Sequence, residues 1–380
     1  MTRPAEIKAL SGARALPPLM IVLYHTCTFH QYVPAEAVLG PPILKGYLWV
    51  EFFFALSGFI LIHVYGTRAR EFWRGRAYVP FLQARLARLY PVHLVTLLSI
   101  LLLMWTLNAL DHEAYVSIYR GPHAPLNTWS TFIANLFLVQ AWNILPDLTW
   151  NSVAWFVSVE FLLCLLFPVT LLLSRGGAWR GATLIAVGIA WLMLLCLPSH
   201  VGLDITIQNG IFRGMAGFAI GVGSAILYRS AMTAGAERVP EWVYSAAQGT
   251  LLVYLAWAIW FSGPARSASD IWTAVGLDAL VLALVFDRGF LARAFASPVL
   301  RRLGEWSYGI YMGQMFWMQL ARYLEQRHFL PNSDLTRWLA PLAVLLVCIG
   351  WGALLAILVE QSANAWLRRA FAQRKHARPA

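Results

Sequence analysis

Ten apolar runs, each close to the length that crosses a bilayer, constrain this chain more than any other feature. A transmembrane helix needs about 20 consecutive, mostly apolar residues. Hydrophobic residues make up 59% of the 380 positions and charged residues 12%, whereas soluble domains carry about 25% charged residues. The sequence therefore predicts an all-α, polytopic membrane helix bundle of about ten transmembrane helices. The runs lie at residues 12–30, 46–66, 89–109, 152–173, 181–198, 210–228, 242–262, 271–286, 306–324 and 338–359.

The basic residues predict how this bundle is oriented, because cytoplasmic loops carry an excess of Lys and Arg. With both termini cytoplasmic, 22 of the 29 Lys and Arg residues face the cytoplasm and 6 face outward. Residues 127–145 carry four amide side chains, and a crossing there would reverse every later loop and remove this asymmetry. We therefore expect a re-entrant or interfacial segment at 127–145. The net charge of +11 comes from these loops and does not indicate nucleic-acid binding.

The chain is expected to form a single membrane-embedded domain over residues 1–369, followed by a basic cytoplasmic tail at 370–380. A second interpretation of residues 1–37 is a signal peptide, because a basic start and a short apolar core precede an A-x-A-like site at Ala35-Glu36-Ala37. The polar residues inside the first run argue against cleavage there. The four cysteines are isolated, so we expect neither a disulfide framework nor a metal site.

Arg14 and His25 are two ionisable residues within the first run. Charged or titratable groups at membrane depth are costly and often mark function. Eleven residues of helix return to nearly the same face after about 16 Å, so Arg14 at the cytoplasmic edge and His25 near mid-membrane are expected on one face. A lone histidine in an apolar helix is often a satisfied core residue. It can also be a general base, because histidine titrates near neutral pH.

Glu160 is a second mid-membrane candidate, within the run at 152–173. It is interpreted either as the structural partner of an arginine such as Arg213 or as the carboxylate that orients a catalytic histidine. Glu51, near the outer end of the second run, is a weaker case of the same kind. Ser57 follows it in a Ser-Gly pair, where small residues let two helix backbones approach.

Arg85 and Arg88 lie three residues apart before Pro91, which places both on one helix face. One interpretation is an interfacial helix on anionic lipid. The other is an anion site, because two guanidinium groups can bind phosphates by paired hydrogen bonds. Both arginines face the cytoplasm in the predicted topology, where phosphorylated cofactors are found.

These residues lie in segments that resemble acyltransferase family 3, the multi-spanning membrane acyltransferases. The resemblance covers residues 7 to about 369 in order. In two segments the chain departs from the family pattern: Phe156 replaces a serine, and Gln314 replaces the histidine that follows Tyr308 and Tyr311. The matching segments read IKALSGARALPPLMIVLYH, VEFFFALSGFIL with Glu51 for the usual aspartate, FLQARLARLYP, WFVSVEFLLCLLFP, LGEWSYGIYMGQ and LVEQSANAWLRR with Glu360 near the usual acidic position.

The resemblance implies an O-acyltransferase of the bacterial cytoplasmic (inner) membrane, with ten helices and both ends inside. Such an enzyme moves an acyl group, usually acetyl, from cytoplasmic acyl-CoA to a hydroxyl of a sugar or related cell-envelope molecule. Arg85, Arg88 and Arg14 would hold the CoA phosphates. His25 would deprotonate the acceptor or relay the acyl group, with Glu160 as its partner. Glu51, Ser57, Tyr308, Tyr311 and Gln314 would support the site.

A secondary transporter of a small anionic or sugar solute is the alternative from another functional class, since transporters also carry buried His, Glu and Arg. Transporters usually show paired repeats with broken helices at the bilayer midplane. The chain shows no such halves, which favours the enzyme.

The topology predicts that single cysteines introduced at Gly121 and at Asp147 are both labelled from outside by an impermeant thiol reagent. The two positions flank 127–145, and because this segment is not expected to cross the membrane, both lie on the same side. The unmodified chain serves as the control for labelling of the native cysteines. Labelling of the two positions from opposite sides would establish an additional span and reverse all later loops.

Overall fold

The structure is a computed structural model that describes residues 6–29, 40–120, 127–329 and 333–365. Every element within these ranges is helical, which agrees with the predicted fold class. The predicted tail at 370–380 and the Ala35-Glu36-Ala37 site lie outside the described residues. The helices are α1 (Lys8–Ala13), α2 (Leu16–Phe29), η1 (Gly46–Trp49), α4 (Val50–Tyr65), η2 (Gly66–Arg68), α5 (Ala69–Trp73), α6 (Tyr78–Leu110), α7 (His112–Tyr119), α8 (Trp129–Leu136), η3 (Ser152–Ala154), α9 (Trp155–Leu165), α10 (Phe167–Leu173), α11 (Ala178–Cys196), α12 (Gly210–Thr233), η4 (Ala236–Arg238), α13 (Glu241–Trp260), α14 (Asp270–Leu284), α15 (Phe290–Phe295), α16 (Pro298–Gln326), α17 (Asp334–Leu354) and η5 (Leu355–Gln361).

Six of the described helices are long and apolar enough to cross a membrane, and one bent pair would make seven. The other predicted runs, at 12–30, 271–286 and 306–324, correspond in the described residues mainly to α2, α14 and α16. However, α2 and α14 have only 14 and 15 residues, and α16 carries charged residues toward both ends. The number of ten spans and the side on which the termini lie therefore stay predictions. The six helices are Gly46–Trp73, Tyr78–Leu110, Ala178–Cys196, Gly210–Thr233, Glu241–Trp260 and Asp334–Ala365, and the pair Ser152–Leu165 and Phe167–Leu173 bends by 64°.

The first apolar run is broken into two helices, which corrects the expectation of one continuous face. α1 ends at Ala13, and α2 begins at Leu16. Pro17 and Pro18 have no backbone N–H, so they cannot donate to the carbonyl groups of the preceding turn, although they fit the first turn of a new helix. Arg14 and His25 therefore belong to separate helical segments and need not share a face.

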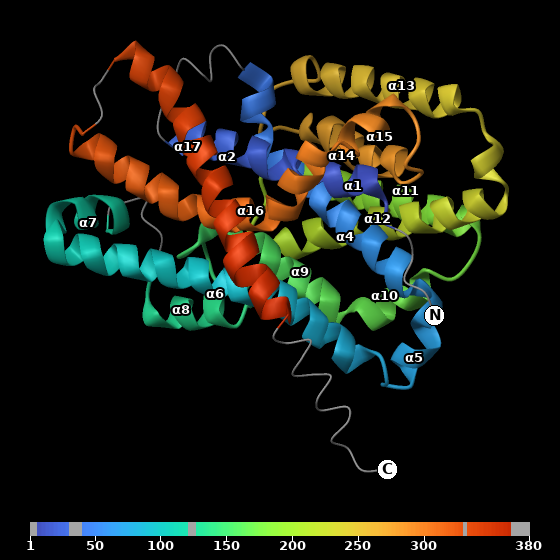
Figure 1. Cartoon of the computed structure of the whole chain (residues 1–380), viewed down its shortest axis with the longest axis horizontal. Helices are drawn as coiled ribbons and strands as arrows, with labels where there is room; N and C mark the ends of the chain where they lie inside the picture. Colours follow the sequence, from blue (N-terminus) through green and yellow to red (C-terminus); the bar gives the residue numbers. More distant parts are fainter. Residues whose placement is uncertain (1–5, 30–39, 121–126, 330–332, 366–380) are drawn as a thin grey trace.

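α4 and α12 form the centre of the bundle, between α13 on one side and α6 on the other (Figure 1). Two glycines allow the backbones of α4 and α12 to touch. A Cβ atom on Gly58 would collide with the carbonyl oxygen of Phe218, and one on Gly221 would collide with the backbone of Ala55. The small-residue contact predicted at Ser57-Gly58 is therefore present, and Gly58 makes it.

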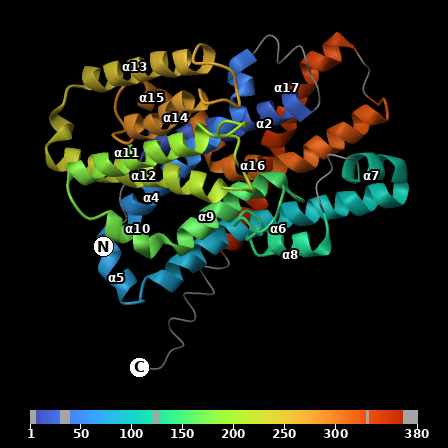
Figure 2. The same cartoon turned by 180° about the vertical axis from the view of Figure 1, so that it is seen from behind.

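Large apolar side chains on the outer helices are exposed, and no other part of the described chain packs over them. Val253 on α13 is 72% exposed, Leu194 on α11 is 69% exposed, and Leu346 on α17 is 59% exposed. Monomeric soluble proteins rarely leave such side chains in continuous patches. Seen from behind, α11 and α13 lie on one side of the bundle and α7 and α8 on the other (Figure 2). This surface is that of a multi-pass membrane protein.

The segment 127–145 contains no helix long enough to span a bilayer. α8 covers eight residues, which is about 12 Å of rise, and the residues that follow it form turns. Its polar side chains turn inward: the side-chain amide of Asn135 donates to the Thr131 carbonyl at 2.9 Å and to the Thr149 hydroxyl at 2.8 Å. This local structure agrees with a segment that does not cross as a helix.

A buried ion pair joins α4 to α12. Arg213 Nε lies 2.5 Å from Glu51 Oε1, and the two side chains are 1% and 0% exposed. The same guanidinium group donates to the carbonyl oxygens of Ile205 at 3.2 Å and Tyr47 at 3.3 Å. Arg213 therefore pairs with Glu51 and not with Glu160, the partner that one interpretation of the sequence gave it.

Replacement of Arg213 by Met should destabilise the fold strongly, because Glu51 would be left as a buried charge without a partner. Removing one member of a buried pair typically costs roughly 3–5 kcal/mol. Thermal unfolding in detergent micelles measures the effect. The control is Arg337→Met, which breaks an exposed pair with Asp334 and should cost about 0–1 kcal/mol. Equal melting temperatures for the two variants would contradict a structural role for the Glu51–Arg213 pair.

Candidate active site

A cavity of about 230 Å³ lies among α1, α4, α6, α9 and α16. It contains most of the residues that the sequence analysis selected, although they come from five separate segments of the chain. The predicted site residues that line the cavity are Arg14, Ser57, Arg85, Arg88, Glu160, Tyr308 and Tyr311.

Arg14, Arg85 and Arg88 form the basic end of this cavity. A second cavity of about 430 Å³ shares these three residues and continues past Tyr65 and Glu360. Among the described residues, the only ion pair of the three arginines joins Arg88 Nε to Glu360 Oε1 at 4.0 Å. Glu6 and Glu305 also line these cavities, but they form ion pairs with Arg301 and Arg302. Among the described residues, Arg14 and Arg85 have no ion-pair partner, which suits an anionic ligand.

Arg85 is also held by aromatic rings. Its guanidinium carbon lies 5.6 Å from the centre of the Phe81 ring and 6.0 Å from that of Tyr65. Such cation–π contacts fix a planar guanidinium while leaving its N–H groups available. The guanidinium group of Arg85 is thus held in place while it can still donate several hydrogen bonds.

Ser57 and Glu160 meet in the middle of the cavity. The Ser57 hydroxyl donates to Glu160 Oε1 at 3.3 Å, and both residues line the wall. Each lies four residues, or one helical turn, from an aromatic residue of its own helix, Phe53 on α4 and Phe156 on α9. The residue pattern alone gave Ser57 a packing role and the family resemblance gave it a supporting one, and the structure places Ser57 in the cavity wall.

Phe53, Phe156 and Tyr311 form the aromatic end of the cavity. The ring centres lie 5.7 Å apart for Phe53 and Phe156, 6.2 Å for Phe53 and Tyr311, and 5.8 Å for Phe156 and Tyr311. The Tyr311 hydroxyl donates to the Val153 carbonyl at 2.9 Å, which fixes its ring. Tyr308, one turn earlier on α16, donates to the Leu89 carbonyl at 2.6 Å.

His25 is not among the residues that line this cavity. Its Nδ1 lies 2.9 Å from Gln314 Oε1, and Gln314 Nε2 donates to the Tyr311 carbonyl at 2.8 Å. Because that carbonyl can only accept, the amide oxygen of Gln314 faces His25 and accepts from Nδ1–H. In the neutral ring, Nε2 is then the nitrogen that can take up a proton. Gln314 thus selects the tautomer of His25.

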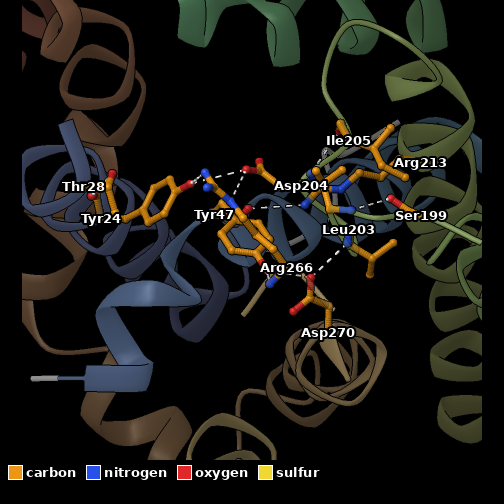
Figure 3. Close-up of polar contacts among 11 residues, drawn as sticks. Tyr24, Thr28, Tyr47, Ser199, Leu203, Asp204, Ile205, Arg213, Arg266 and Asp270 are labelled. Atoms are coloured by element: carbon orange, nitrogen blue, oxygen red, sulfur yellow. Dashed lines mark hydrogen bonds and ion pairs between the residues drawn. The ribbon is translucent and has the colours of Figure 1, made fainter. Parts of the chain in front are cut away.

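A polar network on the same side as His25 ties two loops to α2 (Figure 3). The ring of Tyr24 lies next to that of His25, with 5.1 Å between centres, and the Tyr24 hydroxyl accepts a hydrogen bond from Arg266 Nη2 at 2.8 Å. Arg266 Nε lies 2.9 Å from Asp204 Oδ2. Through Tyr47, which accepts from the Arg266 backbone at 2.7 Å and donates to Asp270 at 2.6 Å, the network reaches α14.

The sequence analysis missed Asp204 and Arg266 of this network and gave no role to Tyr24, although Tyr24 stands next to His25 in a matching segment. The contacts of Tyr24 with Asp204 and Arg266 join positions 180 and 242 residues apart. Of the aromatic end, the sequence analysis selected Tyr311 and named Phe156 only as a departure from the family pattern. Phe53 was part of a motif but was not selected, since an aromatic residue in an apolar helix usually belongs to the core. The replacement of the family's serine by Phe156 was a sequence signal for the aromatic end, because it adds a ring at a position that lines the cavity.

The five-segment cavity, with its cationic end, is the candidate active site of this helix bundle. The family model described as "Acyltransferase domain" matches residues 7–357. The chain therefore belongs to acyltransferase family 3 and is an acyltransferase, which decides against the transporter alternative.

Two curated proteins illustrate the similarity. The chain is 28% identical over 389 residues to "Acyltransferase MdmB" of Streptomyces mycarofaciens, covering 94% of this chain and 92% of that protein. It is 38% identical over 94 residues to "Protein 2 in picA locus" of Rhizobium radiobacter, covering 25% of this chain and 44% of that protein. No solved structure matches the chain.

Changing Arg85 and Arg88 together to Lys should raise the acyl-CoA concentration needed for half-maximal rate by roughly 10- to 100-fold. Lysine keeps the charge but loses the planar fork, and hydrogen bonds to charged groups contribute about 1.5–3 kcal/mol each. Donor binding is measured by calorimetry with the purified protein. The matched control is Arg74→Lys with Arg76→Lys, an exposed pair outside the cavity. Unchanged donor dependence would favour the lipid-contact interpretation.

Proposed function

We propose that this acyltransferase moves an acyl group, acetyl most readily, from cytoplasmic acyl-CoA to a hydroxyl of a sugar or related cell-envelope molecule. The proposal rests on the order of the chemical groups along the cavity. Three guanidinium groups stand at one end, a hydroxyl and a carboxylate in the middle, and three aromatic rings at the other end. This order matches a donor with a phosphorylated head, a thioester and a short apolar acyl group.

The phosphates of CoA would bind at the basic end. Two guanidinium groups on one face of α6 and a third from α1 converge there from different helices, and each can donate two parallel hydrogen bonds. The second cavity beyond them, lined also by Gln361 and Asn364, gives the rest of the nucleotide room outside the first cavity. The cytoplasmic side of the membrane is where this end is expected.

The thioester would lie near Ser57 and Glu160, the polar groups midway along the cavity. Arginines on one side and aromatic rings on the other exclude bulk water from this position, which strengthens electrostatic interactions and limits thioester hydrolysis. Because Glu160 hydrogen-bonds Ser57 inside the cavity, it would act on the donor side, and the role of direct partner to the His25 ring passes to Gln314.

His25 would act on the acceptor. Gln314 lies three residues after Tyr311 on α16, so the imidazole of His25 stands about one turn beyond the aromatic end. The acceptor hydroxyl would approach from the side of the Tyr24–Arg266 network and pass its proton to His25 Nε2. Its oxygen would then attack the acyl carbon, which has to extend past the three rings to meet it, and the CoA thiolate would leave.

Isotope-labelled acetyl-CoA supplied to the purified protein with candidate sugar acceptors tests the proposal directly. We expect label in the acceptor and release of free CoA. Release of CoA with label only in acetate would identify a hydrolase, and failure of any acyl-CoA to bind would remove acyl-CoA as the donor.

His25→Gln should bind acetyl-CoA normally and lose transfer by roughly 10²–10⁴-fold, the usual contribution of a general base. Glutamine keeps hydrogen bonding but cannot take up the proton. Gln314→Leu is the companion variant: it keeps the size but removes the acceptor for Nδ1–H, so it should lower the transfer rate without changing donor binding. Normal transfer by His25→Gln would exclude His25 from the mechanism, and Glu160 would then be the next candidate base.

A further inference from the structure

The second cavity, which continues from the basic end, has one wall from the C-terminal part of the described chain. η5 is a π-helix of seven residues, a form that is rare and frequently found at functional sites. This segment therefore borders the position proposed for the phosphates of CoA. Its lining residues are Ala356, Glu360, Gln361 and Asn364, and Arg14, Arg85 and Arg88 line the same cavity.

The π-helix brings two neighbouring polar side chains to the cavity. Hydrogen bonds of a π-helix join residues five apart, so Gln361 lies one turn beyond Ala356. In an α-helix, Gln361 would instead lie about 140° around the axis from Ala356. Glu360 lines the cavity together with Gln361. The local geometry thus presents a carboxylate and an amide side by side.

Glu360 has hydrogen-bonding capacity that the protein does not use. Its Oε1 lies 4.0 Å from Arg88 Nε, which is too far for a hydrogen bond, and the side chain is only 15% exposed. Its Oε2 is buried and has no hydrogen-bond partner among the described residues. An ionised carboxylate can only accept hydrogen bonds, so a ligand group that binds Oε2 has to be a donor.

We propose that Glu360 accepts a hydrogen bond from the exocyclic amine of adenine in the acyl-CoA donor, an inference that rests on the proposed function. The phosphates of CoA only accept hydrogen bonds, and a carboxylate repels them. The adenosine beyond the phosphates carries the donors, namely the amine and the ribose 2′-hydroxyl. The amine lies beside a ring nitrogen, and a glutamine amide can pair with that edge of adenine, which Gln361 is placed to do.

Glu360 is therefore a specificity-determining residue for the nucleotide of the donor. Its carboxylate lies beside Arg88 at the basic end, so phosphates bound to the arginines would leave the adenosine next to η5. The assignment gives a physical reason for a carboxylate beside an anion site: it selects the base at the cost of some attraction for the phosphates.

The inference is tested with acetyl-CoA and its analogue in which hypoxanthine replaces adenine, so that a carbonyl oxygen stands in place of the amine. Calorimetry measures their binding to the full-length protein in nanodiscs without any acceptor. The wild-type protein should bind the analogue roughly 10- to 100-fold more weakly, because two acceptors would face each other. In Glu360→Gln this preference should largely disappear, because an amide can accept from the amine or donate to the carbonyl.

The matched control is Glu305→Gln, the same change at another glutamate of this cavity, which pairs with Arg302 at 2.9 Å. It should keep the wild-type preference for adenine. Acetyl-4′-phosphopantetheine, which lacks the nucleotide, should bind to Glu360→Gln at least as tightly as to the wild-type protein. Weaker binding would mean that Glu360 supports the basic end and does not recognise adenine.

The 2′-deoxy analogue of acetyl-CoA distinguishes the two donors of the adenosine. It should bind to the wild-type protein as tightly as acetyl-CoA does. If it binds more weakly and Glu360→Gln removes the difference, Glu360 binds the ribose hydroxyl, and the assignment to the amine is wrong.

The outcomes also separate this inference from the proposed function. If acetyl-CoA binds but the wild-type protein does not distinguish adenine from hypoxanthine, Glu360 does not recognise the base, and the donor assignment stands. A preference that persists in Glu360→Gln leads to the same conclusion, and the wild-type comparison alone decides if that variant does not fold. If neither acetyl-CoA nor acetyl-4′-phosphopantetheine binds, the donor is wrong, and the inference fails with it.

Discussion

The buried pair of Glu51 and Arg213 is the interaction on which the arrangement of the bundle depends. Glu51 stands in the first turn of α4 and Arg213 in the first turn of α12, so the pair fixes the register of the two central helices. The remaining N–H groups of Arg213 bind carbonyl oxygens of η1 and of the loop before α12. Because α4 supplies Phe53 and Ser57 to the cavity, this register also sets the depth at which the hydroxyl and the ring meet their partners on α9.

Much of the donor side could be predicted from the sequence, because the signals there are local. The spacing of Arg85 and Arg88 places them on one helix face. A titratable residue in an apolar run, such as Glu160, can be selected as a candidate without knowing how its helix packs. The helical fold follows similarly from the apolar runs. The structure adds that Arg14 joins these residues from another helix, which spacing alone could not show.

The acceptor side could not be predicted in the same way, because its contacts are tertiary. Gln314, a partner of His25, lies 289 positions away. The sequence marked it as a departure from the family's histidine, but could not show that it contacts His25. The break between α1 and α2, just before Pro17 and Pro18, also changed the expected relation of His25 to Arg14. Likewise, two carboxylates were candidate partners of Arg213, and the packing of α4 against α12 selects Glu51.

The break between α1 and α2 bears on how enzymes of this kind diversify. In one straight helix, any substitution that rotates the segment would turn Arg14 and His25 through the same angle. A rotation that improved the position of one side chain would then displace the other. The two prolines remove that mechanical coupling. If Arg14 binds the donor and His25 acts on the acceptor, as proposed, the two functions can then change separately, so that a lineage could exchange its acceptor while keeping its source of acyl groups.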